Sequence, residues 1–350
     1  MNGAERAAMA RARELGLRVL GTTSPNPPVG AVVLDAAGRV VGEGATSPPG
    51  GPHAEVHALA QAGDQARGGT AVVTLEPCAH TGRTGPCADA LIAAGVARVV
   101  VAVPEPTSLA TGGAQRLRAH GVDVELGAEQ AQAEEGALAA WLTGVREHRP
   151  HVVWKVATTL DGRVAAADGS SRWVTGPEAR AEVHRLRAGC DAVLVGSGTV
   201  LADDPQLTVR DATGQDAAHQ PLRVVADRAG RVPAGARVLD GAARTLVSRA
   251  ATPAALLAEL WARDVRRVLL EGGPTLAAAF LSAGLVDEAL VHVAPKLLGA
   301  GAPMVGDLGI AGIGAALHLQ VVDLTQLGGD VQIRLRPTLH TGGGTTGGGS

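Results

Sequence analysis

Short apolar runs of strand character alternate with helix-like segments along almost the whole chain, and this alternation restricts the fold more than any other feature of the sequence. In the first half we predict a hairpin that turns at Ala37-Gly38, then helices over 53–63, 87–95, 114–121 and 134–144 and strands over 70–78, 97–106 and 122–127. In the second half the pattern predicts strands over 151–162, 191–200, 221–227, 266–273 and 288–295 and helices over 181–189, 251–264 and 274–284. Such alternation builds sheets covered by helices, so the chain is predicted to be α/β.

The polar segment VREHRPH separates the two halves and predicts a domain boundary near Arg149. With 350 residues the chain is long enough for two domains that each bury a core. We therefore expect one α/β domain over 1–148, a second over 149–338, and a flexible glycine-rich tail over 339–350.

The composition excludes several classes of function. The formal net charge is −3 and the arginines are scattered, so we expect no nucleic-acid partner. No apolar run approaches twenty residues and the start lacks the apolar core of a signal peptide, so we expect no membrane partner and a cytoplasmic location. The chain has only 3 cysteines, which predicts reduced thiols rather than a disulfide framework. Cys190, alone before an apolar strand, is predicted to be a small core residue.

Two short stretches predict a zinc site. In GGPHAEVHALAQAG, Pro52 favours a helix that begins at His53, and only at such an irregular start can His53 and Glu55 both face one metal. In TLEPCAHTGRTGPC, Cys78 follows a strand and Cys87 begins the next helix. These three ligands would bind one zinc ion per chain and leave its fourth position open for water. Glu55 would then act as a non-ligand acid/base, which suits deamination.

Other zinc sites remain possible alternatives on the sequence. A structural zinc would need a fourth ligand, which His57 or His80 could supply, although His57 is better explained as packing or hydrogen bonding inside the helix layer. A zinc peptidase would read H-E-x-x-H, whereas Glu55 stands two residues after His53. The displaced glutamate and the paired cysteines argue strongly against a peptidase.

Between about residues 7 and 335 the chain resembles the family of bifunctional riboflavin-biosynthesis deaminase/reductases. The resemblance rests on SPNPPVGAVV, HAEVHAL, TLEPCAHTGRTGPC, WKVATTLDGR, SRWVTG, VLVGSGTVLADDPQLTVR and EGGPTLAAAFLSAGLVDE. It implies a cytidine-deaminase-like domain followed by a dihydrofolate-reductase-like domain that binds NADPH without a G-x-G-x-x-G fingerprint. The implied activities are deamination of a phosphorylated ribosylaminopyrimidine and reduction of its ribosyl chain to a ribityl chain.

The resemblance also assigns residues to the two sites. In the deaminase it repeats the zinc and acid/base assignments and adds the substrate contacts Asn26, His80 and Arg83. In the reductase it implies substrate contacts from Ser171, Arg187, Leu207, Arg210 and Glu271. It implies NADPH contacts from Ala157, Trp173, Thr199, Asp203, Gly273, Pro274, Thr275, Leu276, Ala277, Ala278 and Ala279. Arg187 and Arg210 could offer bidentate forks to the substrate phosphate, and Glu271 could accept hydrogen bonds from the pyrimidine.

Lys155, one of two lysines in the chain, has two interpretations. It could be an edge-strand lysine whose ammonium reaches water, or, as the matching family lysine implies, a group beside the ribose that polarises or protonates it during hydride transfer.

Two segments differ from the family pattern, Thr46 where a histidine is usual and Glu105-Pro106-Thr107-Ser108 where D-P-N-P is usual. Both border the deaminase pocket, so a rival interpretation keeps only the reductase, with the zinc domain as a structural or oligomerising module. In either case we expect a homo-oligomer, a dimer or a tetramer.

Overall fold

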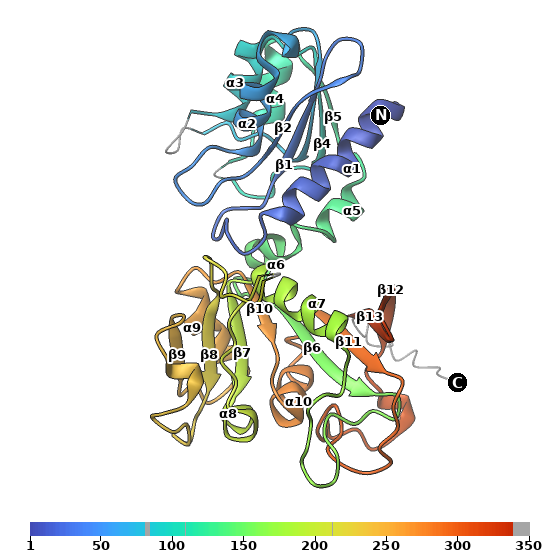
Figure 1. Ribbon diagram of the computed structural model, residues 1–350. Coiled ribbons are helices and arrows are strands. Elements are labelled where there is room, and N and C mark those ends of the chain that lie inside the picture. The colour runs from blue at the N-terminus through green and yellow to red at the C-terminus, as the bar shows by residue number, and fades with distance from the viewer. Residues whose placement is uncertain (81–84, 109, 212, 339–350) are drawn as a thin grey trace, which may run out of the picture.

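The computed structural model describes residues 1–338 except 81–84, 109 and 212, and contains two α/β units, one with a five-stranded and one with an eight-stranded sheet (Figure 1). The predicted α/β class is confirmed. The domain limits at 148 and 338 stay a prediction, although the last helix of the first unit ends at Glu147 and the first strand of the second begins at His151.

The first unit has the strand order β2-β1-β3-β4-β5. β1 pairs antiparallel with β2 and with β3, whereas β3, β4 and β5 are parallel. Its elements are α1 (Gly3–Arg18), β1 (Gly30–Leu34), β2 (Val40–Ala45), α2 (Ala54–Ala62), β3 (Thr70–Leu75), α3 (Cys87–Ala94), β4 (Arg98–Val103), α4 (Gly113–Ala119), β5 (Asp123–Leu126), α5 (Gln130–Glu134) and α6 (Ala139–Glu147).

Glycines in the first hairpin allow helices to pack closely on both faces of this sheet. A Cβ atom at Gly30 would lie 1.9 Å from the carbonyl oxygen of Ala12 in α1, and one at Gly42 would lie 2.0 Å from that of Ala58 in α2. Only glycine therefore fits at either position, and α1 and α2 cover opposite faces (Figure 1). This packing brings the N-terminus of α2, where His53 lies, against the sheet.

The second unit has the strand order β12-β13-β11-β6-β10-β7-β8-β9. The strands from β11 to β9 are parallel, and the β12–β13 hairpin pairs antiparallel at one edge. Its elements are β6 (His151–Thr159), α7 (Pro177–Ala188), β7 (Ala192–Gly196), α8 (Ser197–Asp203), β8 (Leu222–Ala226), β9 (Thr245–Ser248), α9 (Pro253–Trp261), β10 (Arg267–Leu270), α10 (Pro274–Ser282), β11 (Glu288–Ala294), β12 (Leu319–Leu327) and β13 (Asp330–Pro337).

Several predicted elements need correction. The helix expected over 134–144 is split into α5 and α6, because the turn between them contains Gly136, which disfavours helix. The strand expected over 191–200 ends at Gly196, and α8 begins at Ser197. The described residues also contain α1, β9 and the β12–β13 hairpin, none of which the apolar pattern predicted.

The structure defines the surroundings of two residues discussed above, Lys155 and Cys190. β6, which carries Lys155, lies between β11 and β10, so the edge-strand interpretation of this lysine is wrong. Cys190 is 1% exposed within the core of the second unit, which confirms its prediction as a core residue.

Within the described residues, no helix combines the length and apolar character that crossing a membrane requires.

Candidate active sites

The three predicted zinc ligands come together at one end of the first sheet. His53 is the N-cap residue of α2, Cys87 is the first residue of α3, and Cys78 lies just beyond β3. The Nδ1 atom of His53 is 3.3 Å from Sγ of Cys87 and 3.8 Å from Sγ of Cys78, and all three donor atoms lie within 4.8 Å of one another. Zinc bonds of about 2.0–2.3 Å place such donors less than about 4 Å apart. One imidazole and two sulfurs at this spacing fit zinc.

The Cys78 thiol of this cluster ionises readily, which suits binding of a cation. A hydrogen bond from the Cys87 thiol, with help from His53, lowers the pKa of Cys78 well below that of an ordinary thiol. Glu55, in the first turn of α2, is only 5% exposed, and burial raises the pKa of its carboxyl. A carboxyl that holds a proton more readily than usual, next to a metal-ligand set, is suited to moving protons.

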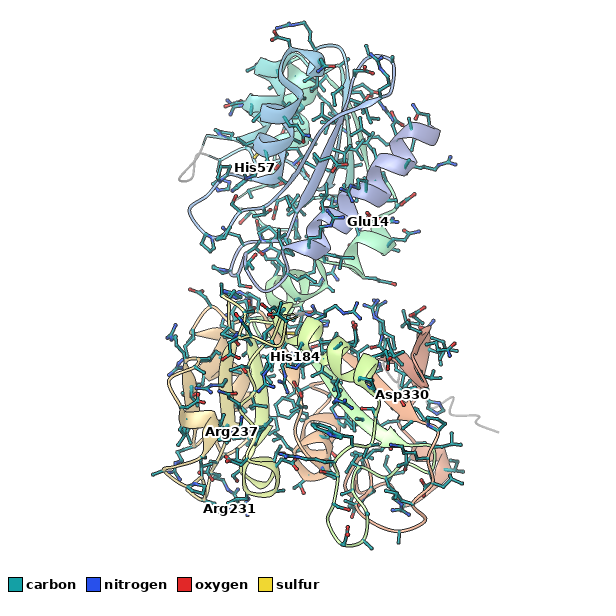
Figure 2. The ribbon with its side chains drawn as sticks, in the orientation of Figure 1. Glu14, His57, His184, Arg231, Arg237 and Asp330 are labelled. Atoms are coloured by element: carbon teal, nitrogen blue, oxygen red, sulfur yellow. The ribbon has the colours of Figure 1, made fainter. Side chains whose placement is uncertain are left out.

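The other histidines near this cluster do not complete a four-ligand site. His57 is exposed (Figure 2), and its Nε2 atom is 2.7 Å from Oγ of Ser47. The expectation that His57 lies inside the helix layer was therefore wrong. The Nδ1 atom of His80 is buried without a hydrogen-bond partner among the described residues, and His80 is not part of the metal-ligand group found there. This unpaired nitrogen could bind a substrate group. Arg83, also predicted to contact substrate, lies outside the described residues.

Three further positions expected at the deaminase pocket have defined surroundings. Asn26 is partly buried in the loop before β1 and lines a small pocket that Asp191 and Arg266 of the second unit also line. Thr46 is buried, and its Oγ1 accepts a hydrogen bond from the Val29 N–H at 3.1 Å. Glu105 accepts hydrogen bonds from the N–H and hydroxyl of Thr107 at 2.9 and 2.5 Å. The side chains at the two positions that depart from the family pattern thus stabilise local backbone.

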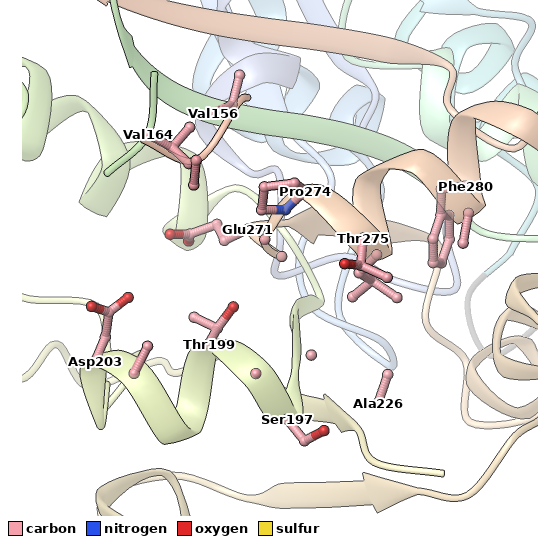
Figure 3. Close-up of a pocket in the computed structure, with 18 of the residues that line it drawn as sticks. Val156, Val164, Ser197, Thr199, Asp203, Ala226, Glu271, Pro274, Thr275 and Phe280 are labelled. Carbon is pink, nitrogen blue, oxygen red and sulfur yellow. The ribbon is translucent and has the colours of Figure 1, made fainter. Parts of the chain in front are cut away.

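The second unit contains a cavity of about 680 Å³ at the carboxyl ends of its central strands (Figure 3). The residues predicted to bind NADPH that line it are Ala157, Thr199, Asp203, Gly273, Pro274, Thr275, Leu276 and Ala279. The N-terminal turn of α10, which begins at Pro274, also lines it and presents the positive end of the helix.

Three predicted NADPH contacts do not line this cavity. Ala277 and Ala278 are 0% and 6% exposed and are buried in the protein instead, Ala277 within the apolar core of the second unit and Ala278 next to Gly306. Trp173 is 64% exposed, and the guanidinium of Arg180 lies 4.5 Å from the centre of its ring. A role for Trp173 in cofactor binding stays a prediction.

The predicted substrate residues divide into two groups. Ser171 and Glu271 line the cavity, as does the predicted catalytic residue Lys155, whereas Arg187, Leu207 and Arg210 do not. Arg187 donates to both carboxylate oxygens of Glu271, from Nε at 2.6 Å and from Nη2 at 2.9 Å. The fork that we expected to bind phosphate is therefore occupied by Glu271, and a phosphate-binding role for Arg187 stays a prediction.

Lys155 and Glu271 form the charged part of the cavity wall. Burial lowers the pKa of the Lys155 ammonium, and the nearby Glu271 carboxylate counteracts part of this shift. Burial by itself would raise the pKa of Glu271, but Arg187 and Lys155 keep it below its usual value. Among the described residues the Lys155 ammonium donates no hydrogen bond, so it is available to a bound molecule.

Two arginines of the cavity were missed from the sequence. Arg228 and Arg231 follow β8 and line the end of the cavity near Ser197. Nη2 of Arg231 donates to Oγ of Ser197 at 2.9 Å. Their position directly after the strand predicted over 221–227 was the available signal, because ligands bind at the carboxyl ends of strands in parallel sheets. Because arginines are scattered along the whole chain, this signal did not distinguish Arg228 and Arg231 from the others.

Known proteins resemble the chain over both units. The family description "Cytidine and deoxycytidylate deaminase zinc-binding region" matches residues 3–103, and "RibD C-terminal domain" matches residues 150–333. The riboflavin biosynthesis protein RibD of Mycobacterium tuberculosis is 51% identical over 328 residues, which cover 94% of this chain and 96% of that protein. RibD of Escherichia coli is 41% identical over 360 residues, which cover 93% and 98% of the two chains.

Solved structures agree with these matches. RibD of Acinetobacter baumannii superposes with a TM-score of 0.85 at 41% identity, covering 96% of this chain and 99% of that one. A diaminohydroxyphosphoribosylaminopyrimidine deaminase/5-amino-6-(5-phosphoribosylamino)uracil reductase from Thermotoga maritima superposes with a TM-score of 0.87 at 34% identity and the same coverage. These matches extend over both units at 34–51% identity, and the chain therefore belongs to the RibD family of riboflavin biosynthesis proteins.

Proposed function

We propose that this bifunctional enzyme first deaminates 2,5-diamino-6-ribosylamino-4(3H)-pyrimidinone 5′-phosphate by zinc-dependent hydrolysis and then reduces the ribosyl chain to a ribityl chain with NADPH. The observation that carries the proposal is the presence of two assembled sites in one chain. One holds His53, Cys78 and Cys87 beside Glu55, and the other holds Lys155 and Glu271 in a cofactor-sized cavity.

In the deamination step, Glu55 is the group that moves protons. When bound at His53, Cys78 and Cys87, zinc supplies a Lewis acid that lowers the pKa of water. The Glu55 carboxylate would accept a proton from the attacking water and pass it to the amino nitrogen that leaves as ammonia. The bond between the ring carbon and the departing amino nitrogen breaks, and the oxygen of the attacking water becomes the carbonyl oxygen on that carbon. His80, with its unpaired Nδ1, and Asn26 would orient the pyrimidine.

In the reduction step, the cavity of the second unit would hold the cofactor and the ribosyl chain of the substrate. Bound NADPH would supply the hydride that reduces the first carbon of the ribose. The electron pair released by that carbon passes to the attached oxygen or nitrogen, and the Lys155 ammonium would deliver the proton. Glu271, fixed by Arg187, would accept hydrogen bonds from the pyrimidine and so hold the ribose next to Lys155.

The proposal is tested by incubating the purified chain with the deaminase substrate and following ammonia and the reduced product with and without NADPH. We expect ammonia in both reactions and reduced product only with NADPH. Reduction of added deaminated substrate without any ammonia release from the first substrate would instead support the rival interpretation, in which Thr46 and Glu105 leave the first unit a structural module.

Zinc content provides a separate prediction. Cys78→Ser and Cys87→Ser should each lose most of the zinc, because a hydroxyl is a much weaker ligand than a thiolate. Cys190→Ser is the matched control, since Cys190 lies in the core of the second unit and should not affect zinc. Metal analysis of the purified proteins would measure the content. Full zinc in both ligand variants would show that these sulfurs do not bind it.

The preference for NADPH over NADH should depend on Arg228. The positions of Arg228 and Arg231 at one end of the cavity suit the extra phosphate of NADPH. Arg228→Ala should lower the ratio of kcat/KM for NADPH to that for NADH by about tenfold or more, the scale of one charge-assisted hydrogen bond. Arg244→Ala, an exposed arginine away from the cavity, is the control. An unchanged ratio would exclude Arg228 from cofactor choice.

We also infer a homo-oligomer, a dimer or a tetramer, located in the cytoplasm. Support for assembly comes from the β12–β13 hairpin at the edge of the second sheet, where Val321, Leu324 and Val331 are 55%, 63% and 41% exposed. Exposed apolar strands at a sheet edge are common sites of association. Sedimentation velocity can test this inference.

A further inference from the structure

Residues 207–210, which include the predicted substrate contacts Leu207 and Arg210, form an irregular segment between α8 and β8. Leu207 is buried and has a φ of 60°, a left-handed conformation that is rare for leucine. The segment belongs to no strand of the second sheet, so its backbone needs other partners. The Ala217 N–H supplies one of them, since it donates to the Val209 carbonyl at 2.9 Å, and side chains from α7 and from the end of the following loop supply the others.

The side chain of Gln220 forms hydrogen bonds with both backbone groups of Val209, as a neighbouring strand would. Its Oε1 accepts a hydrogen bond from the Val209 N–H at 2.7 Å, and its Nε2 donates to the Val209 carbonyl at 2.9 Å. The same Nε2 donates to the Ala217 carbonyl at 2.8 Å. A carboxamide that satisfies both backbone groups of one residue fixes that residue in position and orientation.

His184 on α7 holds the next residue (Figure 2). The Arg210 N–H donates to Nδ1 of His184 at 3.1 Å. Because a backbone N–H can only donate, Nδ1 must be unprotonated in this arrangement. One turn further along α7, Nη1 of Arg187 donates to the Thr208 carbonyl at 3.0 Å while the rest of its guanidinium binds Glu271. The segment is thereby connected to the wall of the reductase cavity.

These contacts fix the backbone of Arg210 but leave its side chain available. The Arg210 guanidinium is exposed, and among the described residues its only hydrogen bond is a long one, 3.4 Å, to Oε1 of Gln206. A guanidinium on a rigid base can bind a phosphate without first losing backbone freedom.

We propose that His184 and Gln220 are positioning residues of the reductase, which hold the backbone at Val209 and Arg210 and so direct the Arg210 guanidinium at the substrate phosphate. This inference rests on the proposed function, and it takes Arg210 to be the phosphate contact that the family resemblance implies. It predicts that losing either positioning side chain weakens binding of the phosphorylated substrate and leaves NADPH binding unchanged.

The test compares KM and kcat of the full-length zinc-loaded enzyme in four proteins with the deaminated substrate: wild type, Arg210→Ala, His184→Leu and the double variant. We expect His184→Leu to raise KM about fivefold to tenfold, the scale of one hydrogen bond, with little change in kcat. Combined with Arg210→Ala it should add almost nothing, because the side chain that it positions is absent. Gln220→Leu should behave like His184→Leu.

Two controls separate positioning from a general loss of structure. His219→Leu changes an exposed histidine next to Gln220 and should leave KM unchanged. The substrate without its 5′-phosphate should have the same KM with wild type and with His184→Leu, since the contact that Arg210 makes is then missing. A higher KM for NADPH, or the same rise in KM with both substrates, would indicate a merely structural role and overturn the inference.

The remaining outcomes are also distinguishable. If Arg210→Ala leaves KM unchanged, the proposed phosphate contact is wrong and this inference fails with it. If Arg210→Ala raises KM and His184→Leu does not, the proposed contact stands and the positioning role of His184 alone is wrong.

A further variant, His184→Asn, keeps the role of His184 testable if the leucine variant folds poorly. Its Oδ1 stands at the place of Nδ1 and remains an acceptor at every pH. In the wild type, burial lowers the pKa of His184, and Arg187 and Arg210 lower it further, while Glu271 opposes them. Protonation at low pH would replace the acceptor by a donor facing the Arg210 N–H.

We therefore expect the KM of the wild type to rise more steeply than that of His184→Asn as the pH falls below about 6, where imidazole ordinarily titrates. The phosphate of the substrate titrates alike in both, so the difference between the two curves belongs to residue 184. Parallel curves would contradict a neutral His184 as the group that holds Arg210.

Discussion

The Glu55→Gln enzyme is expected to release ammonia at least a few hundred-fold more slowly than the wild type, the scale usual for the loss of a general acid/base. Glu55 is buried beside the metal ligands, and burial raises the pKa of its carboxyl toward the range in which it can both accept and return a proton. A glutamine fills the same space and can hydrogen-bond, but it cannot carry a proton between water and the leaving amine.

Three measurements on Glu55→Gln show whether the loss is specific to deamination. Zinc content and thermal unfolding should match the wild type, because Glu55 is not a ligand in the group formed by His53, Cys78 and Cys87. Reduction of supplied deaminated substrate should also be unchanged, since the cavity of the second unit does not include Glu55. Glu14→Gln, an exposed residue of α1, is the matched control. Ammonia release at the wild-type rate would remove Glu55 from the mechanism.

Lys155→Met is expected to lower turnover of the deaminated substrate by roughly two orders of magnitude, the usual scale for acid catalysis. Methionine keeps the packing of the long stem but removes the proton. Lys155 lines the cavity from an interior strand, next to Glu271, and burial lowers the pKa of its ammonium, so its proton is released more readily than that of an ordinary lysine.

The chain contains its own control for this substitution. Lys296 is the only other lysine, and its ammonium donates to the backbone carbonyls of Trp173 and Val174 at 2.9 and 2.8 Å. Lys296→Met should therefore retain near wild-type turnover, although it removes the same charge from the same unit. NADPH affinity, followed by the quenching of tryptophan fluorescence, should be similar in both variants. Wild-type turnover by Lys155→Met would exclude Lys155 as the proton donor, and catalysis of hydride transfer would then depend on the positioning of the reactants alone.

Elements with strong local patterns could be predicted from the sequence. The hairpin of β1 and β2, the helix that begins after His53 and the buried strand β6 all follow from apolar runs bounded by glycine or proline. β12 and β13 could not be found this way, because most of their residues are only partly buried or exposed. A strand that buries little has little reason to alternate apolar and polar residues.

The metal site was accessible from sequence because its chemistry is local. His53 stands at a helix start that Pro52 favours, and Cys78 and Cys87 flank one loop, so residue type and spacing already restricted their geometry. The pairing of Arg187 with Glu271 was not accessible. These residues are 84 positions apart and meet only because the fold brings the last turn of α7 next to the residue that follows β10. Two opposite charges buried together bind each other before they bind a ligand.

By itself the sequence determined which chemistry this protein can perform. Imidazole, thiolate, carboxyl and ammonium groups occur at spacings that few unrelated chains would share, and the identity of a functional group is a property of the residue alone. Only the tertiary structure decided which of these groups face a ligand. It placed Lys155 on an interior strand, turned Ala277 and Ala278 into the core, added Arg228 and Arg231 to the cavity and anchored Arg210 through His184. The direction in which a side chain points depends on how helices pack across a sheet, and that packing brings together residues that no local sequence pattern relates.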